Sequence, residues 1–181
     1  MSVTKAVLER IRNDHAPALL AFERENRAFF AASVPDRGDA YFEDAGFAAR
    51  HRALLDEQET GTILFHVLVT GDGEILGRFN LIDVDQESGT AELGYRVAEK
   101  AAGRGLATAT VRELCIRARE EYGLSRLTAR TTPDNGPSRA VLARVGFGAV
   151  GSVTLEDGER GIAYELDLGG SFGREWSGTD S

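Results

Sequence analysis

The fold is decided by one nine-residue stretch, Lys100–Thr108, which reads KAAGRGLAT. Gly103 and Gly105 allow the backbone to turn tightly, and the apolar spacing that follows predicts a helix over 105–122. The first N–H groups of a helix have no partner within it, and the helix dipole favours an anion there. The stretch therefore predicts a phosphate-binding turn that leads into a helix.

Local charge and motif spacing narrow the range of ligands that this turn could bind. Arg96, Lys100 and Arg104 outnumber Glu99 locally, although the whole chain carries a net charge of −8. A P-loop would need GxxxxGK[ST], which is absent from the sequence, and a dinucleotide fingerprint, GxGxxG, would need glycine where Thr108 stands. A nucleotide-binding domain is therefore disfavoured. The alternative without a ligand is that the glycines only break the chain and cap the helix.

Hydrophobic periodicity alternates between the helical and the strand pattern, which predicts an α+β sheet with helices on its faces. We expect strands at 7–11, 62–69, 75–84, 90–97, 126–131, 149–155 and 161–168, and helices at 13–29, 42–59, 105–122 and 138–145. Asn13 or Asp14 is expected to cap the first helix, which has Pro17 in its first turn. Hairpin turns are expected at 71–73 and 87–89.

Length and composition predict one domain over 1–168 and a flexible C-terminal tail over 169–181. No apolar run approaches the length that crosses a bilayer, and no basic, apolar leader opens the sequence. Cys115 is the only cysteine and falls on an apolar helix stripe, so we expect a small buried side chain and a reducing, cytoplasmic location. The acidic balance disfavours nucleic acid as a partner.

Further motifs occur in order along the chain: FERENRAFF at 22–30, GRFNL at 77–81, AELGYRV at 91–97 and LTARTTPDNGPSRAVLARVGF at 127–147. With the glycine turn, they resemble the GNAT superfamily of acetyl-CoA-dependent N-acetyltransferases. Within it, the chain is most similar to the RimJ/RimL-like branch, the ribosomal-protein N-terminal acetyltransferases and their relatives. The resemblance covers roughly residues 5–168. It implies a mixed, mostly antiparallel sheet of about seven strands, with helices on both faces and strands splayed at the cofactor cleft.

The resemblance also implies where acetyl-CoA binds. The backbone around Gly103–Thr108 would hold the pyrophosphate, and main-chain groups near Arg96 and Val97 would pair with the pantetheine arm. The superfamily motif is written [QR]xxGxG, and Lys100 in its first position keeps the charge but loses the planar fork of arginine. The cofactor-binding residues expected are Arg96, Val97, Lys100, Gly103, Arg104, Gly105, Leu106, Ala107, Thr108 and Asn135.

Three residues are candidates for catalysis. Strand alternation places Glu92 on the same face as Gly94, so that Glu92 can accept the amine proton; the alternative is an ion-paired glutamate. By resemblance, Ser138 reaches the cofactor sulfur and supports the departing thiolate, and Asn135 binds the pantetheine arm. Both also have a structural explanation at the start of a helix. Tyr164 is the reserve candidate for the role of Ser138, with a core tyrosine as the alternative.

The sequence favours one function and leaves alternatives open. We expect transfer of an acetyl group from acetyl-CoA to a primary amine, a protein or peptide N-terminus, by direct attack in a ternary complex. The alternatives are a small-molecule amine as acceptor, or a non-catalytic acyl-CoA-binding module. No metal is expected, because the three histidines have no ligand-like spacing.

Sequence clues to the acceptor and other partners are few. The resemblance implies that Phe29, Phe30, Tyr41 and Phe42 line the acceptor groove. Aromatic residues on amphipathic helices, however, more often belong to the hydrophobic core. The carboxylates at 156, 157 and 159 could attract a cationic acceptor or only form a solvated hairpin tip. No membrane partner is expected, and an exposed edge strand together with Phe172 and Trp176 of the tail favours a homodimer.

Overall fold

The structure is a computed structural model that describes residues 5–170 and 172. Its strands are β1 (Ala6–Arg10), β2 (Leu64–Thr70), β3 (Ile75–Asp85), β4 (Thr90–Val97), β5 (Arg126–Thr131), β6 (Gly148–Thr154) and β7 (Arg160–Asp167). Its helices are α1 (Ala16–Glu25), α2 (Arg27–Ala31), α3 (Asp44–Thr60), α4 (Leu106–Glu120) and α5 (Gly136–Val145). Short 3₁₀ helices are η1 (Asn13–His15), η2 (Asp39–Phe42) and η3 (Glu99–Ala101).

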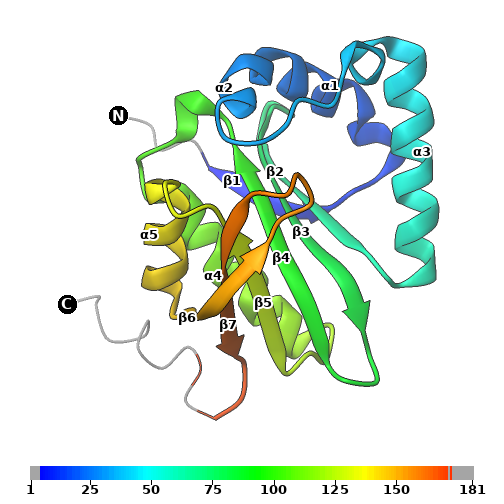
Figure 1. Ribbon diagram of the computed structural model, residues 1–181. Coiled ribbons are helices and arrows are strands. Elements are labelled where there is room, and N and C mark those ends of the chain that lie inside the picture. Colours follow the sequence, from blue (N-terminus) through cyan, green and yellow to red (C-terminus); the bar gives the residue numbers. More distant parts are fainter. Residues whose placement is uncertain (1–4, 171, 173–181) are drawn as a thin grey trace. The chain divides into compact units, whose positions relative to one another are not determined.

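The seven strands of the described chain form a sheet in the order β1-β2-β3-β4-β5-β7-β6 (Figure 1). β4 and β5 are parallel, whereas the β1–β2, β2–β3, β5–β7 and β6–β7 pairs are antiparallel. The predicted α+β fold with a mixed, mostly antiparallel sheet is thus confirmed. The splay of strands at a cofactor cleft stays a prediction.

Contacts divide the chain into two compact units. The first unit comprises residues 1–82 and 94–104, and the second comprises residues 83–93 and 105–181. Strand β4 continues from one unit into the other, so no linker separates them. The expected single domain over 1–168 stays a prediction. Most of the expected tail, with Trp176, lies outside the described residues.

The first unit is built on the β1–β3 strands. The β2–β3 hairpin closes where predicted, since the N–H of Gly73 donates to the carbonyl of Thr70 at 3.0 Å. Helix α3 contacts both α1 and β2. The buried side chains that form this core include Leu8, Leu19, Phe22, Val67, Phe79 and Leu81.

The first helix begins differently from the prediction. Asn13 and Asp14 lie inside η1, and α1 has His15 at its N-cap without a side-chain cap bond. Instead, the backbone N–H of Arg12 donates to Nδ1 of His15 at 2.9 Å, and Asp14 accepts from the guanidinium of Arg12 at 3.0 Å. The predicted caps are therefore wrong, because Asp14 is engaged by a nearer charged donor.

The same helix also ends earlier than predicted. Asn26 interrupts it: its amide Nδ2 donates to the carbonyl of Phe22 at 2.8 Å, and its Oδ1 accepts from the N–H of Glu99 at 3.0 Å. An asparagine side chain bonded in this way competes with the helical backbone. Helix α1 stops at Glu25, and the remaining turn forms α2.

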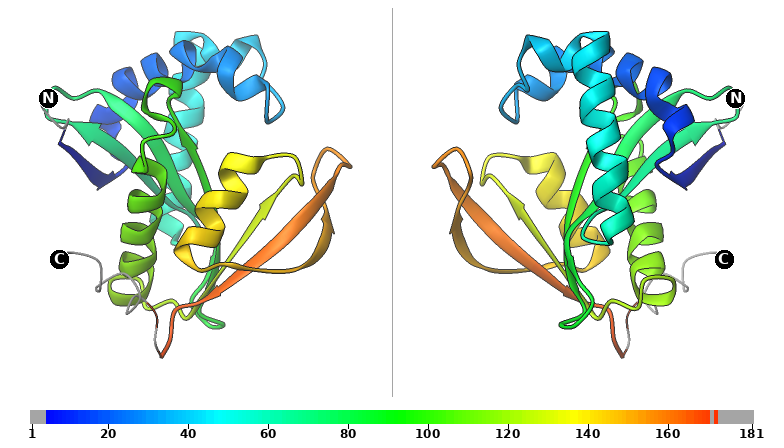
Figure 2. Two further views of the ribbon diagram at one scale, coloured as in Figure 1. Left: turned by 90° about the vertical axis from the view of Figure 1, so that its left-hand side faces the viewer. Right: turned by 90° about the vertical axis from the view of Figure 1, so that its right-hand side faces the viewer.

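In the second unit, α4 packs against α5 next to the β5, β6 and β7 strands. Its core includes Leu114, Cys115, Leu127 and Leu142. After α4 the chain turns at Gly123, whose φ is +67°. Figure 2 shows the long β6–β7 hairpin extending past α5. No helix in the described part of either unit is long and apolar enough to cross a membrane.

Candidate active site

The predicted phosphate-binding turn has an open backbone. Gly103 and Gly105 have φ values of +74° and +75°, a region that L side chains rarely adopt. A Cβ atom at either glycine would meet nothing within 4 Å. Gly105 is the N-cap of α4 and offers no side-chain cap, so the N–H groups of the first helical turn are free of a capping side chain. This arrangement fits a pyrophosphate group.

The two basic residues of the turn differ in their surroundings. The Nζ of Lys100 is 2.7 Å from a carboxylate oxygen of Glu74 and 3.7 Å from one of Glu25. The hydrogen bond to Glu74 raises the pKa of Lys100. Arg104 is exposed and has no ion pair within the part of the chain that the structure describes. Arg104 is therefore the cation of this turn that is free to meet a phosphate.

The end of β4 makes one main-chain hydrogen bond and one side-chain ion pair within the first unit. Ala98, just after Val97, donates its N–H to the carbonyl of Leu76 at 2.8 Å. The guanidinium of Arg96 reaches Oε2 of Glu23 at 3.7 Å. The pairing of the main chain near Arg96 and Val97 with a pantetheine arm stays a prediction.

Glu92 is held by an arginine. Its two carboxylate oxygens accept hydrogen bonds from Arg130 at 2.7 and 3.3 Å, across the parallel β4–β5 pair. The two side chains are 21% and 34% exposed, so water and a ligand can still reach them. The ion pair predicted as the alternative is present, and the role of Glu92 as a base stays a prediction.

Asn135 and Ser138 form the start of α5. The Oδ1 of Asn135 accepts the backbone N–H of Ser138 at 3.3 Å, as an N-cap does. The structural explanation for Asn135 is thus confirmed, and its amide nitrogen remains as the group for a pantetheine carbonyl. The cofactor roles of both residues stay predictions.

Tyr164 and Cys115 are both core residues. Tyr164, on β7, is 6% exposed and lies opposite Ala129 of β5. Cys115 is completely buried, and burial raises the pKa of its thiol to about 12. A thiolate nucleophile at Cys115 is therefore excluded at neutral pH. For Tyr164 to take part in catalysis, its hydroxyl would have to reach a ligand from within the core.

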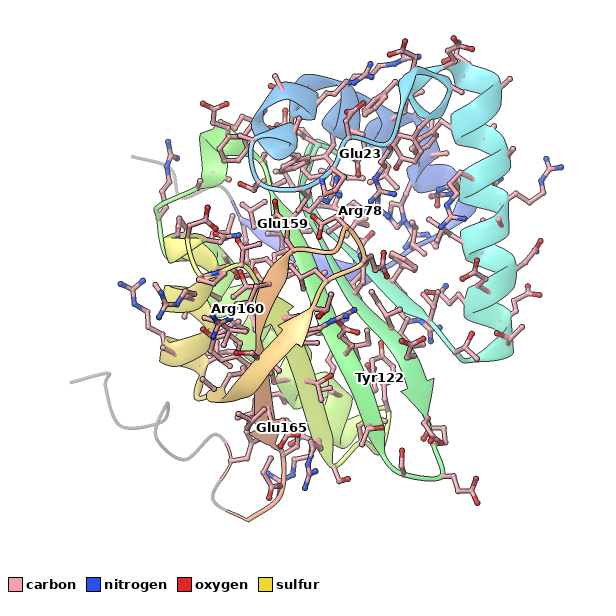
Figure 3. All side chains as sticks on the ribbon, in the orientation of Figure 1. Glu23, Arg78, Tyr122, Glu159, Arg160 and Glu165 are labelled. Atoms are coloured by element: carbon pink, nitrogen blue, oxygen red, sulfur yellow. The ribbon has the colours of Figure 1, made fainter. Side chains whose placement is uncertain are left out.

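The most strongly buried charges of the described chain were not predicted. Glu23 of α1 and Arg78 of β3 point toward one another (Figure 3), with Oε1 and Nη1 2.6 Å apart and both side chains at most 3% exposed. Arg78 also donates to the hydroxyl of Tyr41 at 3.2 Å. Burial is the largest single influence on the pKa of Arg78 and lowers it, but the charges and hydrogen bonds of Glu23 and Tyr41 together outweigh burial and raise that pKa.

A small pocket of the first unit lies beside this pair. Its enclosed volume is only about 10 Å³, the rest is open to solvent, and Glu23 and Arg96 line it. Phe30 and Phe42, two of the four aromatic residues predicted for the acceptor groove, also line it, and its identity with that groove stays a prediction. Phe29 and Tyr41 do not line it. Glu23 and Arg78 lie within motifs of the sequence, but 55 residues separate them and nothing local marks them as a pair.

Comparison with known proteins identifies the family to which the chain is similar. A family model described as "Acetyltransferase (GNAT) domain" matches residues 5–148. "Putative ribosomal N-acetyltransferase YdaF" of Bacillus subtilis (strain 168) is 32% identical, and the match covers 86% of this chain and 82% of that protein. The [ribosomal protein uS5]-alanine N-acetyltransferase of Escherichia coli (strain K12) is 28% identical over 81% and 77% of the two chains.

Solved structures agree with this placement. Mycobacterium smegmatis RimJ, in complex with CoA-disulfide, superposes with a TM-score of 0.80 at 27% identity, covering 88% of this chain and 80% of that one. The ribosomal-protein-S5-alanine acetyltransferase of Vibrio fischeri gives a TM-score of 0.84 at 20% identity over 93% and 96%, which supports the fold. The chain therefore belongs to the GNAT family and is an acetyl-CoA-dependent N-acetyltransferase.

Proposed function

We propose that this enzyme acetylates the α-amino group of a protein or peptide N-terminus. The observation that carries the proposal is the similarity, over more than four-fifths of the chain, to proteins named for N-acetylation of ribosomal proteins. An α-amino group has an ordinary pKa near 8, so a useful fraction is uncharged at neutral pH and needs only a modest base.

The proposed donor site uses the glycine turn and the end of β4. Acetyl-CoA, when bound, supplies the acetyl group as an activated thioester. The N–H groups at the start of α4 bind the pyrophosphate, with Arg104 nearby. The main chain at Arg96 and Val97 orients the pantetheine arm, and the amide nitrogen of Asn135 donates to one of its carbonyls.

The proposed acid and base are Glu92 and Ser138. Glu92 takes the proton of the attacking amine, directly or through water, and the hydroxyl of Ser138 donates a hydrogen bond to the departing sulfur. Tyr164 remains the reserve for Ser138. Transfer is direct in a ternary complex, because the only cysteine is buried as the neutral thiol.

The donor site is tested with Gly105→Asp, which places bulk and negative charge at the phosphate-binding turn. Gly61→Asp is the matched control, because Gly61 also has a positive φ (+82°) and open space around it. At about 100 times the Kd, acetyl-CoA should stabilise the wild type and the control by about 2.7 kcal/mol in a thermal-shift titration. The Gly105 variant should show no shift, and an unchanged shift there would refute the site.

The acceptor is tested by release of free CoA with peptides and with small amines. Turnover of peptides with a free N-terminus, and none with N-terminally blocked peptides that contain lysine, is expected. Preferential turnover of small amines would replace the proposal with the small-molecule alternative. Binding of acetyl-CoA without turnover of any amine would leave an acyl-CoA-binding module. A Ser138→Ala variant should lower kcat while its affinity for acetyl-CoA is unchanged.

A further inference from the structure

The pocket of the first unit combines a cationic floor with an apolar wall. The guanidiniums of Arg37 and Arg96 line the pocket with the carboxylate of Glu23, and the guanidinium of Arg78, which does not line it, binds that same carboxylate. Phe30, Ala31, Val34, Pro35 and Phe42 form the apolar wall. The inner group thus has a surplus of two positive charges in a chain whose net charge is −8.

The carboxylates at the rim of the pocket do not neutralise this surplus. Asp36 binds both nitrogens of the Arg27 fork, at 3.0 and 2.8 Å, and Asp39 binds Arg27 as well, at 2.7 Å. These two carboxylates against one guanidinium leave a surplus of one negative charge outside the inner group. The pocket as a whole therefore remains net positive.

Arg37 and Arg96 are the cations with unused donors. Arg96 is 3.7 Å from Glu23, which already binds Arg78 at 2.6 Å, and its guanidinium lies 5.2 Å from the centre of the Phe30 ring. Arg37 lies 4.8 Å from the centre of the Tyr41 ring and has no carboxylate within ion-pair distance among the described residues.

The pKa values of these two arginines reflect the same imbalance. Although Arg37 is partly exposed, crowding by protein atoms and the charge of Arg78 lower its pKa. Burial and the charge of Arg37 lower the pKa of Arg96 to about 10, which still leaves it charged at neutral pH. Two charged guanidiniums whose neighbours disfavour their charge would be stabilised by an anion between them.

Resting on the proposed function, we propose that this pocket binds a carboxylate of the acceptor and makes the enzyme selective for anionic acceptors. A carboxylate matches the forked donors of arginine, and its aliphatic stem would contact the apolar wall. The enclosed part of the pocket measures only about 10 Å³, room for about one water molecule, and the rest is open to solvent. The pocket can therefore take the carboxylate end of an acceptor, and the rest of the acceptor stays outside it.

The position of Arg96 links this pocket to the reaction. Its side chain lines the pocket, and its main chain is proposed to orient the pantetheine arm. An acceptor whose carboxylate is bound there would be anchored next to the proposed donor site. Two sources of the carboxylate share this chemistry: an acidic side chain near a peptide N-terminus, and the α-carboxylate of a small amino acid.

The test compares matched acceptors with the wild-type enzyme. Peptides with Glu at the second or third position are paired with peptides that have Gln there, and free amino acids are paired with their amides. We expect kcat/KM to be about ten- to a hundredfold higher for the carboxylate member, mainly through KM. A preference among the peptides assigns the site to a side chain, and a preference among the amino acids assigns it to an α-carboxylate.

Two variants locate the selectivity. Arg37→Gln removes a pocket charge, whereas Arg52→Gln removes an exposed charge of α3 that does not line the pocket. The preference should fall to near one in the first variant and persist in the second. Equal rates for the paired acceptors in the wild type would overturn the proposal. A rise in the KM for acetyl-CoA with no change in selectivity would also overturn it, because the pocket would then serve the donor.

Direct binding separates this proposal from the proposed function. If no acceptor releases CoA, the transferase proposal fails, and titration calorimetry with N-acetylglutamate and with N-acetylglutamine amide, which has no carboxylate, then decides about the pocket. Binding of only the glutamate compound, lost in the Arg37 variant, would support the carboxylate site. Absence of binding, or equal binding of both compounds, would refute it.

Discussion

Two glutamate–arginine pairs of nearly equal length lie in the two units, in different surroundings. Glu23 and Arg78 approach to 2.6 Å with side chains 1% and 3% exposed. Glu92 and Arg130 approach to 2.7 Å with side chains 21% and 34% exposed. Removing one partner of a buried pair leaves an uncompensated charge without water, whereas water and salt replace the partner of an exposed one. Burial, and not distance, therefore separates a structural pair from one that can open for chemistry.

The largest expected effect is on stability, in the buried pair. Glu23→Gln should lower the free energy of unfolding by about 3–5 kcal/mol, because it leaves Arg78 buried without its carboxylate. Urea denaturation at 25 °C measures the change. The double variant Glu23→Met with Arg78→Leu should regain most of the loss, since both charges of the pair are then removed. Equal stability of the single variant and the wild type would contradict the comparison.

The next effect is on catalysis, in the exposed pair. Glu92→Gln should lower kcat with a peptide N-terminus about a hundredfold, the low end for loss of a general base, because Arg130 already competes for its oxygens. Its free energy of unfolding should change by at most about 1 kcal/mol. Arg130→Gln is the control and should retain kcat, since the carboxylate remains. An unchanged kcat in the Glu92 variant would leave this residue with only its ion pair.

Salt should also change the stability contributed by the two pairs differently, but by a smaller amount. Arg130→Gln should cost at most about 1 kcal/mol at low ionic strength, and 1 M salt should remove most of that difference by screening. The stability lost in Glu23→Gln should persist at 1 M salt, because salt screens a pair with side chains at most 3% exposed only weakly. Thermal melts at two salt concentrations measure both. A salt-independent loss in the Arg130 variant would show that this pair is better shielded than its exposure indicates.

Local patterns predicted much of the fold. The bounds of β4 and β5 were predicted to the residue, because both follow period-2 alternation between clear turns. The open glycine turn and the buried Cys115 were also predicted, since each depends on neighbours in the sequence. In each of these cases the information lies within one element.

Features that depend on distant partners were missed. The helix breaks at Asn26 because its Oδ1 binds the N–H of Glu99, 73 residues away. Glu23 and Arg78 are 55 residues apart, and each by itself resembles a surface charge of a helix or a strand. Only the folded structure shows that they form a pair. The anionic selectivity inferred for the pocket follows from such long-range contacts, whereas the sequence had left open whether the carboxylates at 156, 157 and 159 attract a cationic acceptor or only form a solvated hairpin tip.

The smallest expected effect is a pH dependence of stability, and it too differs between the two units. All three histidines lie in the first unit, and His51 is 2% exposed with Nε2 donating to the carbonyl of Arg12 at 3.1 Å. Its Nδ1 has no partner among the described residues. Burial lowers the pKa of His51 below its ordinary 6.5, against a smaller opposing effect of the hydrogen bond.

The sign of the pH effect follows from that depressed pKa. Above pH 6.5 the ring is neutral in both the folded and the unfolded state, and His51 adds no pH dependence. As the pH falls below 6.5, the unfolded chain takes up the proton more readily, so the free energy of unfolding decreases toward the lower native pKa. Melting at pH 7.5 and 5.5 should show a fall in Tm that is smaller in His51→Gln, and Glu92→Gln should show the wild-type fall. An equal fall in both variants would show that groups other than His51 cause the acid sensitivity.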